Sequence, residues 1–239
     1  MKTKLALVSA LATMFAAGSA HALIIDDFSV VQPQIYIVGP APVTSFNNLQ
    51  SGPGANILGG VRETDVTLYQ GNAAADVNVR VVAGVLDVND SVSAATEVVL
   101  TWDAGGLGLG NIDLYDGGAT GIYLAFPTAM DHALILTFDI DDFGSGLTAS
   151  RSITFPIGSQ GSDFFFSFSN FTNTSALLSA DSIRMTLNST TPGLDANLDL
   201  IETRDTPIGA VPEPATMSLL GLGLLGLGLT RRKGKARNA

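Results

Sequence analysis

The 239-residue sequence contains no cysteine, and this absence limits the chemistry open to the protein. Without a thiol, neither a cysteine nucleophile nor a thiolate metal ligand is available. A disulfide framework is excluded too, although a chain of this size can bury a sizeable core without one. Beyond residue 22 the sequence has one histidine, His132. A single histidine cannot build a multi-histidine transition-metal site.

Positive charge is scarce in the body of the chain, residues 23–210. This body has no lysine, five arginines and 21 acidic residues, which gives a formal net charge of −16. Seven of the twelve basic residues lie outside it, so the value of −10 for the whole chain understates its acidity. Such a body cannot neutralise phosphates, and we therefore expect no nucleic-acid partner. Cations, neutral sugars and basic surfaces remain as candidate partners.

The N-terminal residues have the composition of a secretory signal peptide. Lys2 and Lys4 come before an apolar run at 5–17, and Ala20-His21-Ala22 gives the small-x-small cleavage pattern. As a helix the apolar run would span about 20 Å, less than the roughly 30 Å of a hydrocarbon core, which argues against a permanent anchor. We therefore predict export by the Sec machinery, cleavage by signal peptidase after Ala22, and Leu23 as the first mature residue.

The C-terminal residues combine three features in a fixed order. Val211-Pro212-Glu213-Pro214 comes first, an apolar span covers 215–230, and a tail covers 231–239. The span would be about 24 Å long as a helix, which requires a thin bilayer or snorkelling flanks. Basic residues favour the cytoplasmic side, so we expect a short transmembrane helix with the body outside and the tail inside. The basic residues of the tail are Arg231, Arg232, Lys233, Lys235 and Arg237.

This arrangement resembles the PEP-CTERM sorting signal of Gram-negative bacteria, over about 29 of the 239 residues. The resemblance implies that Pro212, Glu213 and Pro214 form the motif recognised by an exosortase, a membrane cysteine peptidase that processes the signal in the inner membrane. It also implies transient anchoring, then a location at the cell surface or outside the cell, in organisms that make exopolysaccharide and biofilms. The peptidase chemistry belongs to that partner and not to this chain.

The body has a composition typical of strands and turns. Aspartate far outnumbers glutamate, glycine is abundant and lysine is absent, which disfavours helices and favours turns. Segments such as Ser182–Asn188 alternate apolar and polar residues with period two, the signature of half-buried strands. We therefore predict an all-β fold, an antiparallel, jelly-roll-like β-sandwich. The expected strands are residues 23–28, 34–38, 61–69, 76–81, 82–88, 97–102, 121–126, 133–140, 151–155, 164–168, 182–188 and 194–202.

The expected organisation is a signal peptide at 1–22, the sandwich at 23–202, a linker at 203–210 and the sorting signal at 211–239. The body also loosely resembles the jelly-roll sandwiches of exported surface proteins and carbohydrate-binding modules. That resemblance rests on Ile25-Asp26-Asp27-Phe28 near the start and Leu198-Asp199-Leu200-Ile201 near the end.

Structural calcium is the one cofactor that the sequence suggests, because Asp-rich loops supply the oxygen ligands that calcium prefers. One candidate set is Asp26 and Asp27 with Asp199, near the two ends of the sandwich. The other is Asp139, Asp141 and Asp142. This second segment departs from an EF-hand loop, which requires an acidic residue at its twelfth position, where Ser150 stands. Turn chemistry explains both clusters equally well.

No catalytic site is expected. His132 follows Asp131, but the sequence has no G-x-S-x-G elbow to supply a serine nucleophile, and the loop position is explanation enough for this histidine. The carboxylates cannot be sorted into glycosidase pairs without a fold.

Sugar binding usually needs exposed aromatic rings, and the candidates are Trp102, Tyr69, Tyr115 and Tyr123. Trp102 closes an apolar strand and is expected in the core, whereas Tyr115, in a Gly-rich loop, is the best exposed candidate. The sequence therefore predicts an exported, non-enzymatic surface or extracellular-matrix protein. The alternative is a polysaccharide-binding module on the same scaffold, assisted by calcium.

Overall fold

The computed structural model describes residues 22–128, 130–157, 163–189 and 191–205. The chain divides into two units, 1–207 and 208–239, and all described residues belong to the first. The predicted signal helix, sorting motif and C-terminal transmembrane helix therefore lie outside the described residues. Within the described ranges no helix has the length and apolar character needed to cross a membrane.

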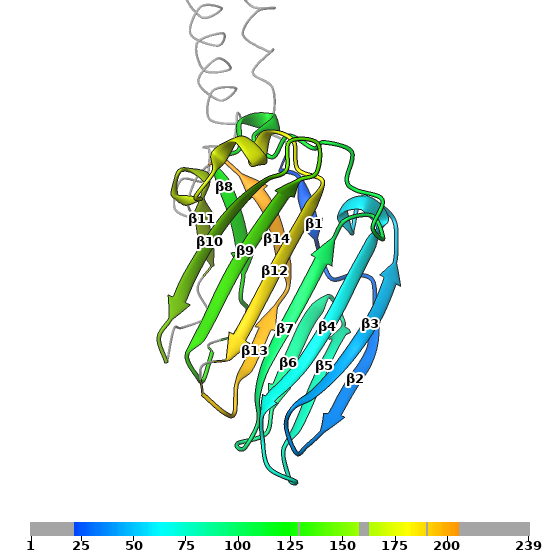
Figure 1. Ribbon diagram of the computed structural model, residues 1–239, viewed down its shortest axis with the longest axis vertical. Coiled ribbons are helices and arrows are strands. Elements are labelled where there is room, and N and C mark those ends of the chain that lie inside the picture. The colour runs from blue at the N-terminus through cyan, green and yellow to red at the C-terminus, as the bar shows by residue number, and fades with distance from the viewer. Residues whose placement is uncertain (1–21, 129, 158–162, 190, 206–239) are drawn as a thin grey trace, which may run out of the picture. The chain divides into compact units, whose positions relative to one another are not determined.

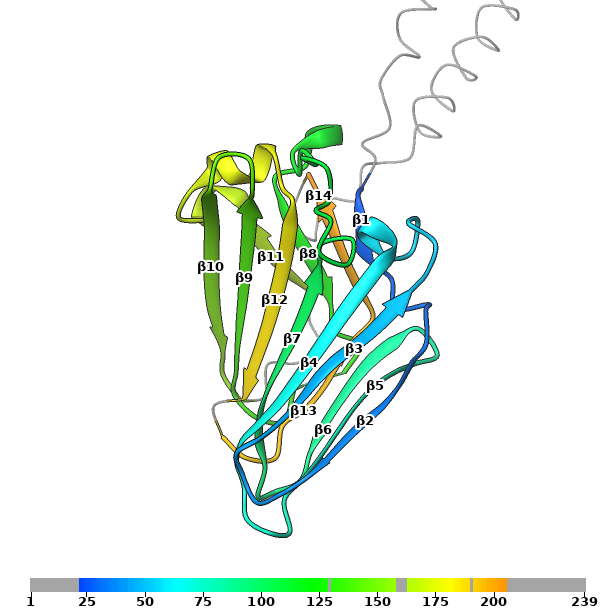
Figure 2. The ribbon, with the colours of Figure 1, turned by 45° about the vertical axis from the view of Figure 1, so that its right-hand side comes forward.

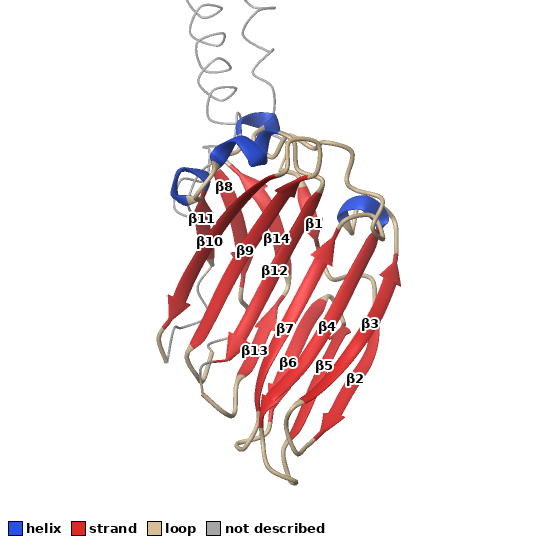
Figure 3. Cartoon of the chain, in the orientation of Figure 1, coloured by secondary structure: helices blue, strands red, loops and turns tan. Residues whose placement is uncertain are grey.

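The described chain is all β, as predicted, and its strands form three antiparallel sheets (Figure 3). One sheet has six strands, in the order β10-β9-β12-β7-β4-β3, and two sheets have four strands each, in the orders β1-β14-β8-β11 and β13-β6-β5-β2. The six-stranded sheet is built from β3 (Val43–Ser51), β4 (Val61–Gln70), β7 (Ala95–Trp102), β9 (Leu134–Asp142), β10 (Leu147–Phe155) and β12 (Ser182–Ser189). The other strands are β1 (Ile24–Asp26), β2 (Gln32–Val38), β5 (Asp76–Val82), β6 (Val85–Asp90), β8 (Gly121–Ala125), β11 (Phe164–Ser167), β13 (Asp195–Leu198) and β14 (Leu200–Arg204).

The sheets make two layers, with the six-stranded sheet in front of the two four-stranded sheets in Figure 1. The turned view in Figure 2 shows β5 and β2 as a separate layer beside β4 and β3. The four-stranded sheets are neighbours along the chain at two places. β1 and β2 are consecutive strands, and β13 and β14 are separated by Asp199 alone. The backbone N–H of Asp199 donates to the carbonyl of Ala125 at 3.0 Å at this crossing. The two sheets of the second layer are therefore connected directly by the chain, although each sheet has its own set of paired strands.

The core lies between the two layers and is built by period-two alternation. In β9, Leu134, Leu136, Phe138 and Ile140 are buried, while the residues between them are half-buried. Burying each such side chain stabilises the fold by about 1.5–3 kcal/mol. Trp102 is 0% exposed, so the expectation that it packs in the core is confirmed. Short 3-10 turns cap one end of the described strands: η1 (Leu58–Gly60), η2 (Asp116–Gly118), η3 (Phe168–Asn170) and η4 (Thr174–Leu178).

Several boundaries differ from the sequence prediction, and the expected strand 194–202 is two strands, β13 and β14, which belong to different sheets. β3 was not expected, because its sequence is rich in serine, threonine and asparagine, and it lies at a sheet edge where it pairs with β4. The expected strand 82–88 begins instead at Val85, after a turn at Ala83 and Gly84. β14 extends to Arg204, beyond the expected end at 202, because Thr203 is fully buried and its N–H donates to the carbonyl of Leu23 at 2.9 Å.

Candidate functional site

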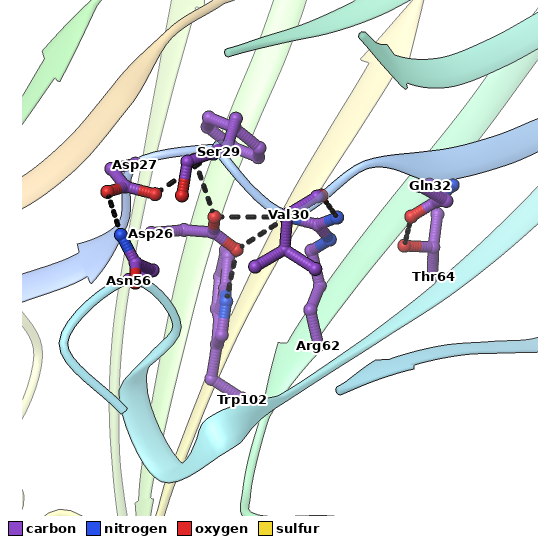
Figure 4. Close-up of polar contacts among 10 residues, drawn as sticks. Asp26, Asp27, Ser29, Val30, Gln32, Asn56, Arg62, Thr64 and Trp102 are labelled. Carbon is purple, nitrogen blue, oxygen red and sulfur yellow. Dashed lines mark hydrogen bonds and ion pairs between the residues drawn. The ribbon is translucent and has the colours of Figure 1, made fainter. Parts of the chain in front are cut away.

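A buried polar cluster is centred on Asp26, at the end of β1 (Figure 4). Asp26 and Arg62 are both 0% exposed, and Arg62 Nη1 donates to Asp26 Oδ1 at 3.0 Å and Oδ2 at 2.9 Å. Trp102 Nε1 donates to Oδ2 at 2.9 Å, and the backbone N–H of Phe28 donates to Oδ1 at 2.8 Å. Arg62 Nη2 also donates to the carbonyl of Val30 at 3.0 Å. Both oxygens of Asp26 are thus engaged, and the cluster fastens the first strand to the six-stranded sheet.

Asp27, the next residue, faces a different set of partners. The backbone N–H of Ser29 donates to its Oδ1 at 2.9 Å, and Asn56 Nδ2 donates to its Oδ2 at 2.6 Å (Figure 4). Partial burial acts to raise the pKa of Asp27, but the hydrogen bonds from Ser29 and Asn56 outweigh it and lower that pKa. Asp27 therefore stays ionised and closes a local turn.

Asp199, the third member of the first calcium candidate set, lies where the chain passes from β13 to β14. Its Oδ1 is buried without a hydrogen-bond partner, and burial together with the nearby Asp163 raises its pKa. The strand opposite β1 pairs Asp26 with Ile201 and not with Asp199. The structure therefore gives Asp26, Asp27 and Asp199 separate surroundings.

The second candidate set lies on β9 and its turn. Asp139 pairs with Arg184 at 3.2 Å, Asp141 accepts from Thr148 Oγ1 at 2.6 Å, and Asp142 accepts from Ser145 Oγ at 2.6 Å. Because side chains alternate along a strand, Asp141 and Asp142 point to opposite faces. The described part of the chain holds no group of three or more histidine, aspartate or glutamate side chains arranged to hold a metal ion.

The aromatic candidates for sugar binding occupy different environments. Tyr115 is half-buried, and its ring lies 4.8 Å from that of Phe168, so it is less free than its loop position suggested. Tyr123 is 5% exposed and lies beneath the guanidinium of Arg204, 3.6 Å from the ring centroid. Tyr69 is 40% exposed, on the outer side of the six-stranded sheet.

The outer face of the sheet β13-β6-β5-β2 gathers polar side chains in two rows. Strand register places Tyr36 of β2 beside Asn78 of β5, Asn78 beside Asn89 of β6, and Asn89 beside Asp195 of β13. The second row runs from Arg80 through Asp87 to Asn197. The intervening residues of these strands, including Ile35, Ile37, Val77 and Val79, are buried in the core. We call the seven residues Tyr36, Asn78, Arg80, Asp87, Asn89, Asp195 and Asn197 the amide face.

Sequence reasoning missed the amide face because it did not consider Tyr36, which is 57% exposed. A signal was present, since Tyr36 stands between Ile35 and Ile37 in a period-two segment and must point away from them. The pairing of the four strands could not be known from the sequence, so the rows could not be assembled.

Polar contacts hold the amide face in place. Asn89 Nδ2 donates to Asp195 Oδ1 at 2.6 Å, and Arg80 Nε donates to Asp87 Oδ2 at 3.0 Å. Tyr36 OH donates to Asp76 Oδ2 at 3.2 Å, and this hydrogen bond with the aspartate charge raises the pKa of Tyr36.

A second buried carboxylate, that of Asp90, links the two layers through hydroxyl groups instead of a positively charged partner. Asp90 of β6 is 5% exposed, and Thr96 Oγ1 lies 2.9 Å from its Oδ1 and 2.7 Å from its Oδ2. Ser189 Oγ lies 3.5 Å from Oδ2. Burial raises the pKa of Asp90 to about 7, because these hydroxyls compensate only part of the lost solvation.

His132 lies in the bend before β9, and its Nδ1 is 3.1 Å from Asp131 Oδ1. This is the loop position that the sequence favoured over a catalytic role.

Comparison with known families identifies the class of the C-terminal segment. The family described as the PEP-CTERM protein-sorting motif matches residues 210–233. The chain therefore carries a PEP-CTERM sorting signal, as the sequence predicted. A search among curated proteins found no match to this chain.

Several solved structures are similar to the chain at low sequence identity. The family 11 carbohydrate-binding module of the cellulosomal cellulase Lic26A-Cel5E of Clostridium thermocellum is 14% identical, covers 79% of this chain and 97% of its own, and has a TM-score of 0.39. The agarase AgWH50C is 14% identical over 78% of this chain and 25% of its own, with a TM-score of 0.43. PfGH50B is 17% identical over 56% of this chain and 22% of its own, with a TM-score of 0.37. The chain thus spans about a quarter or less of the last two proteins, and similarity at this level transfers no ligand or activity.

Proposed function

We propose that the protein is an exported, non-catalytic protein of the cell surface or extracellular matrix. The observation that carries this proposal is the match of residues 210–233 to the PEP-CTERM sorting motif. The sandwich supports it, because the polar cluster of Asp26 with Arg62 and Trp102 is buried in the core rather than open to a substrate.

The proposed route uses both ends of the chain. The Sec machinery exports the protein, signal peptidase cleaves after Ala22, and the apolar span at 215–230 holds the body at the inner membrane. The basic tail, Arg231 to Arg237, stops transfer on the cytoplasmic side. An exosortase then recognises Pro212, Glu213 and Pro214, and processing releases the body toward the surface.

Mass spectrometry of the surface protein tests this route. The released protein should begin at Leu23 and lack Arg231–Ala239. In cells without the exosortase, or in a variant with both Pro212→Ala and Pro214→Ala, the protein should stay in the membrane fraction with its tail intact. Released protein that still carries the tail would contradict the route.

Polysaccharide binding is a second candidate function, and the amide face is the observation that favours it. In this version the sandwich holds exopolysaccharide around the cell, with calcium as structural support and Tyr115 as a further contact. Calcium that binds the folded state at 100 times its Kd would add about 2.7 kcal/mol of stability. An unchanged melting temperature with chelator and with calcium in the millimolar range would remove calcium from the proposal.

A further inference from the structure

We propose that the amide face is the binding site for a neutral polysaccharide. This inference deepens the second candidate function and rests on it. It names the surface, the chemical class of the ligand and the aromatic residue of that surface that contacts the ligand, which is Tyr36.

The dimensions of the amide face suit an extended chain of sugars. The row Tyr36, Asn78, Asn89 and Asp195 crosses four adjacent strands. With about 4.8 Å between neighbouring strands, the row is about 14 Å long. A glycan lying across the strands would meet one side chain on every strand, with a second row, Arg80, Asp87 and Asn197, alongside.

Tyr36 supplies the apolar contact. It lies on the edge strand β2, is 57% exposed, and its hydroxyl is held by Asp76 at 3.2 Å. An aromatic ring restrained in this way can cover the apolar face of a sugar ring at little cost in side-chain entropy.

The amides supply the polar contacts. Each asparagine offers an acceptor oxygen and two donor N–H groups, which matches a sugar hydroxyl that both donates and accepts. Asn78 lies between Tyr36 and Asn89, and because its Oδ1 is shielded from solvent, it can offer a ligand only its Nδ2 group. Asn89 uses one N–H on Asp195, which orients its remaining groups. The row therefore keeps hydrogen-bonding capacity that the free protein does not use.

Charge selects a neutral ligand. The one arginine of the amide face is paired with Asp87, while Asp195 and the neighbouring Asp76 leave the surface negative. The body as a whole carries a formal charge of −16, so a polyanionic glycan would be repelled.

The outer side of the six-stranded sheet is less suitable, because it presents carboxylates where the amide face presents amides. Glu63, Asp65 and Glu97 lie on adjacent strands there, with Arg184 beside Asp139. Tyr69 on that side thus provides a matched control, an exposed tyrosine in a different chemical setting.

Affinity electrophoresis of the full chain in mild detergent tests the proposal, with gels containing β-glucan, xylan, agarose or starch, and with alginate as the anionic comparison. The wild-type protein should be retarded by at least one neutral polysaccharide and not by alginate. Tyr36→Ala should weaken that binding about tenfold, the loss expected for an aromatic residue that anchors a ligand. Tyr36→Phe, which keeps the ring, should retain most of it, Asn89→Ala should weaken it, and Tyr69→Ala should leave it unchanged. Melting curves confirm that each variant is folded.

The possible results distinguish an error in the proposed binding site from an error in the proposed function. If the wild type binds and Tyr36→Ala binds equally well, the assignment to the amide face is wrong while polysaccharide binding stands. Stronger retardation by alginate would overturn the neutral class. If none of the neutral polysaccharides retards the wild type, both this inference and the second candidate function fail, and the sorting proposal is unaffected.

Discussion

Two buried aspartates of the sandwich have raised pKa values but different partners. Burial raises the pKa of Asp26, although the guanidinium of Arg62 at 2.9 Å and the hydrogen bonds from Trp102 and Phe28 oppose this rise. Asp90 faces hydroxyls of Thr96 and Ser189, which donate hydrogen bonds but carry no positive charge. Burial of an uncompensated charge costs several kcal/mol, so the protonated form of Asp90 is favoured.

Asp90 makes the stability of the protein depend on pH. Its pKa in the folded state is about 7, above the ordinary value of 3.8, so the folded state binds the proton more tightly than the unfolded state. The stability that this proton contributes is complete below pH 3.8, falls as the pH rises, and is lost above about pH 7. Asp90→Asn keeps a neutral group at the site, so it should be more stable than wild type by about 1–3 kcal/mol near pH 8.

Urea unfolding near pH 5 and near pH 8 measures this effect. The gain from Asp90→Asn should shrink at the lower pH, where wild-type Asp90 is protonated. Asp87→Asn, on the same strand but paired with Arg80 at the surface, is the control and should change stability by less than about 1 kcal/mol at both pH values. An equal effect of Asp90→Asn at the two pH values would show that Asp90 does not change its protonation between them, which would contradict a pKa of about 7.

Substitutions in the Asp26 cluster should destabilise the fold, in contrast to Asp90→Asn, because removing one partner of the ion pair leaves the other as an unpaired buried charge. Asp26→Ala and Arg62→Met should each destabilise the fold by about 3–5 kcal/mol. The double variant should cost clearly less than the sum of the two, since it leaves no unpaired charge. Trp102 is the single tryptophan of the chain and donates to Asp26, so its fluorescence reports the change directly. Strictly additive losses would contradict the ion pair.

These residue roles could not be predicted from the sequence. Asp26 and Asp27 look equivalent as calcium ligands in Ile25-Asp26-Asp27-Phe28, yet Asp26 ends β1 and is fully buried, whereas Asp27 follows the strand and is half-buried. Arg62 and Trp102, which engage Asp26, lie 36 and 76 residues away in the sequence.

At the scale of elements, turn chemistry was the weakest part of the prediction. The expected strand 82–88 stops before Asn89 and Asp90, yet both belong to β6, because strand neighbours satisfy their side chains. The true turn is at Ala83 and Gly84, where φ is 53° and 81°. Two consecutive positive φ values are typical of a two-residue hairpin, but alanine gives no signal for one.

This turn is a site where one substitution should stabilise the protein. An alanine with positive φ is strained, whereas Asn-Gly is the favoured pair for such a hairpin. Ala83→Asn should therefore raise stability by about 0.5–1 kcal/mol, and Gly84→Ala should lower it by about 1 kcal/mol or more. Thermal unfolding of the two variants beside wild type measures both. Destabilisation by Ala83→Asn would argue against the hairpin.

At the scale of the whole molecule, the composition and the period-two alternation of apolar and polar residues predicted the all-β class correctly. They predicted the arrangement of the sheets in layers only in outline. Segments such as Ser182–Asn188 are strands because alternation with burial is a local property, and β12 was placed to within one residue. Which strand pairs with which depends on contacts between distant segments. Tyr36, Asn78, Asn89 and Asp195 become one row only after β2, β5, β6 and β13 are aligned.

The surplus of negative charge should itself limit stability. With a formal charge of −16 in the body, repulsion among carboxylates opposes the compact state, and salt weakens it by shortening the screening length from about 30 Å at 10 mM to about 8 Å at 150 mM. The melting temperature should therefore rise by a few degrees over this range of sodium chloride. Calcium chloride at matched ionic strength separates screening from a bound ion: a larger rise than with sodium chloride is expected if the aspartate clusters hold calcium, and an equal rise if they do not. A melting temperature that falls with salt would mean that attractive pairs such as Arg80 with Asp87 outweigh the repulsion.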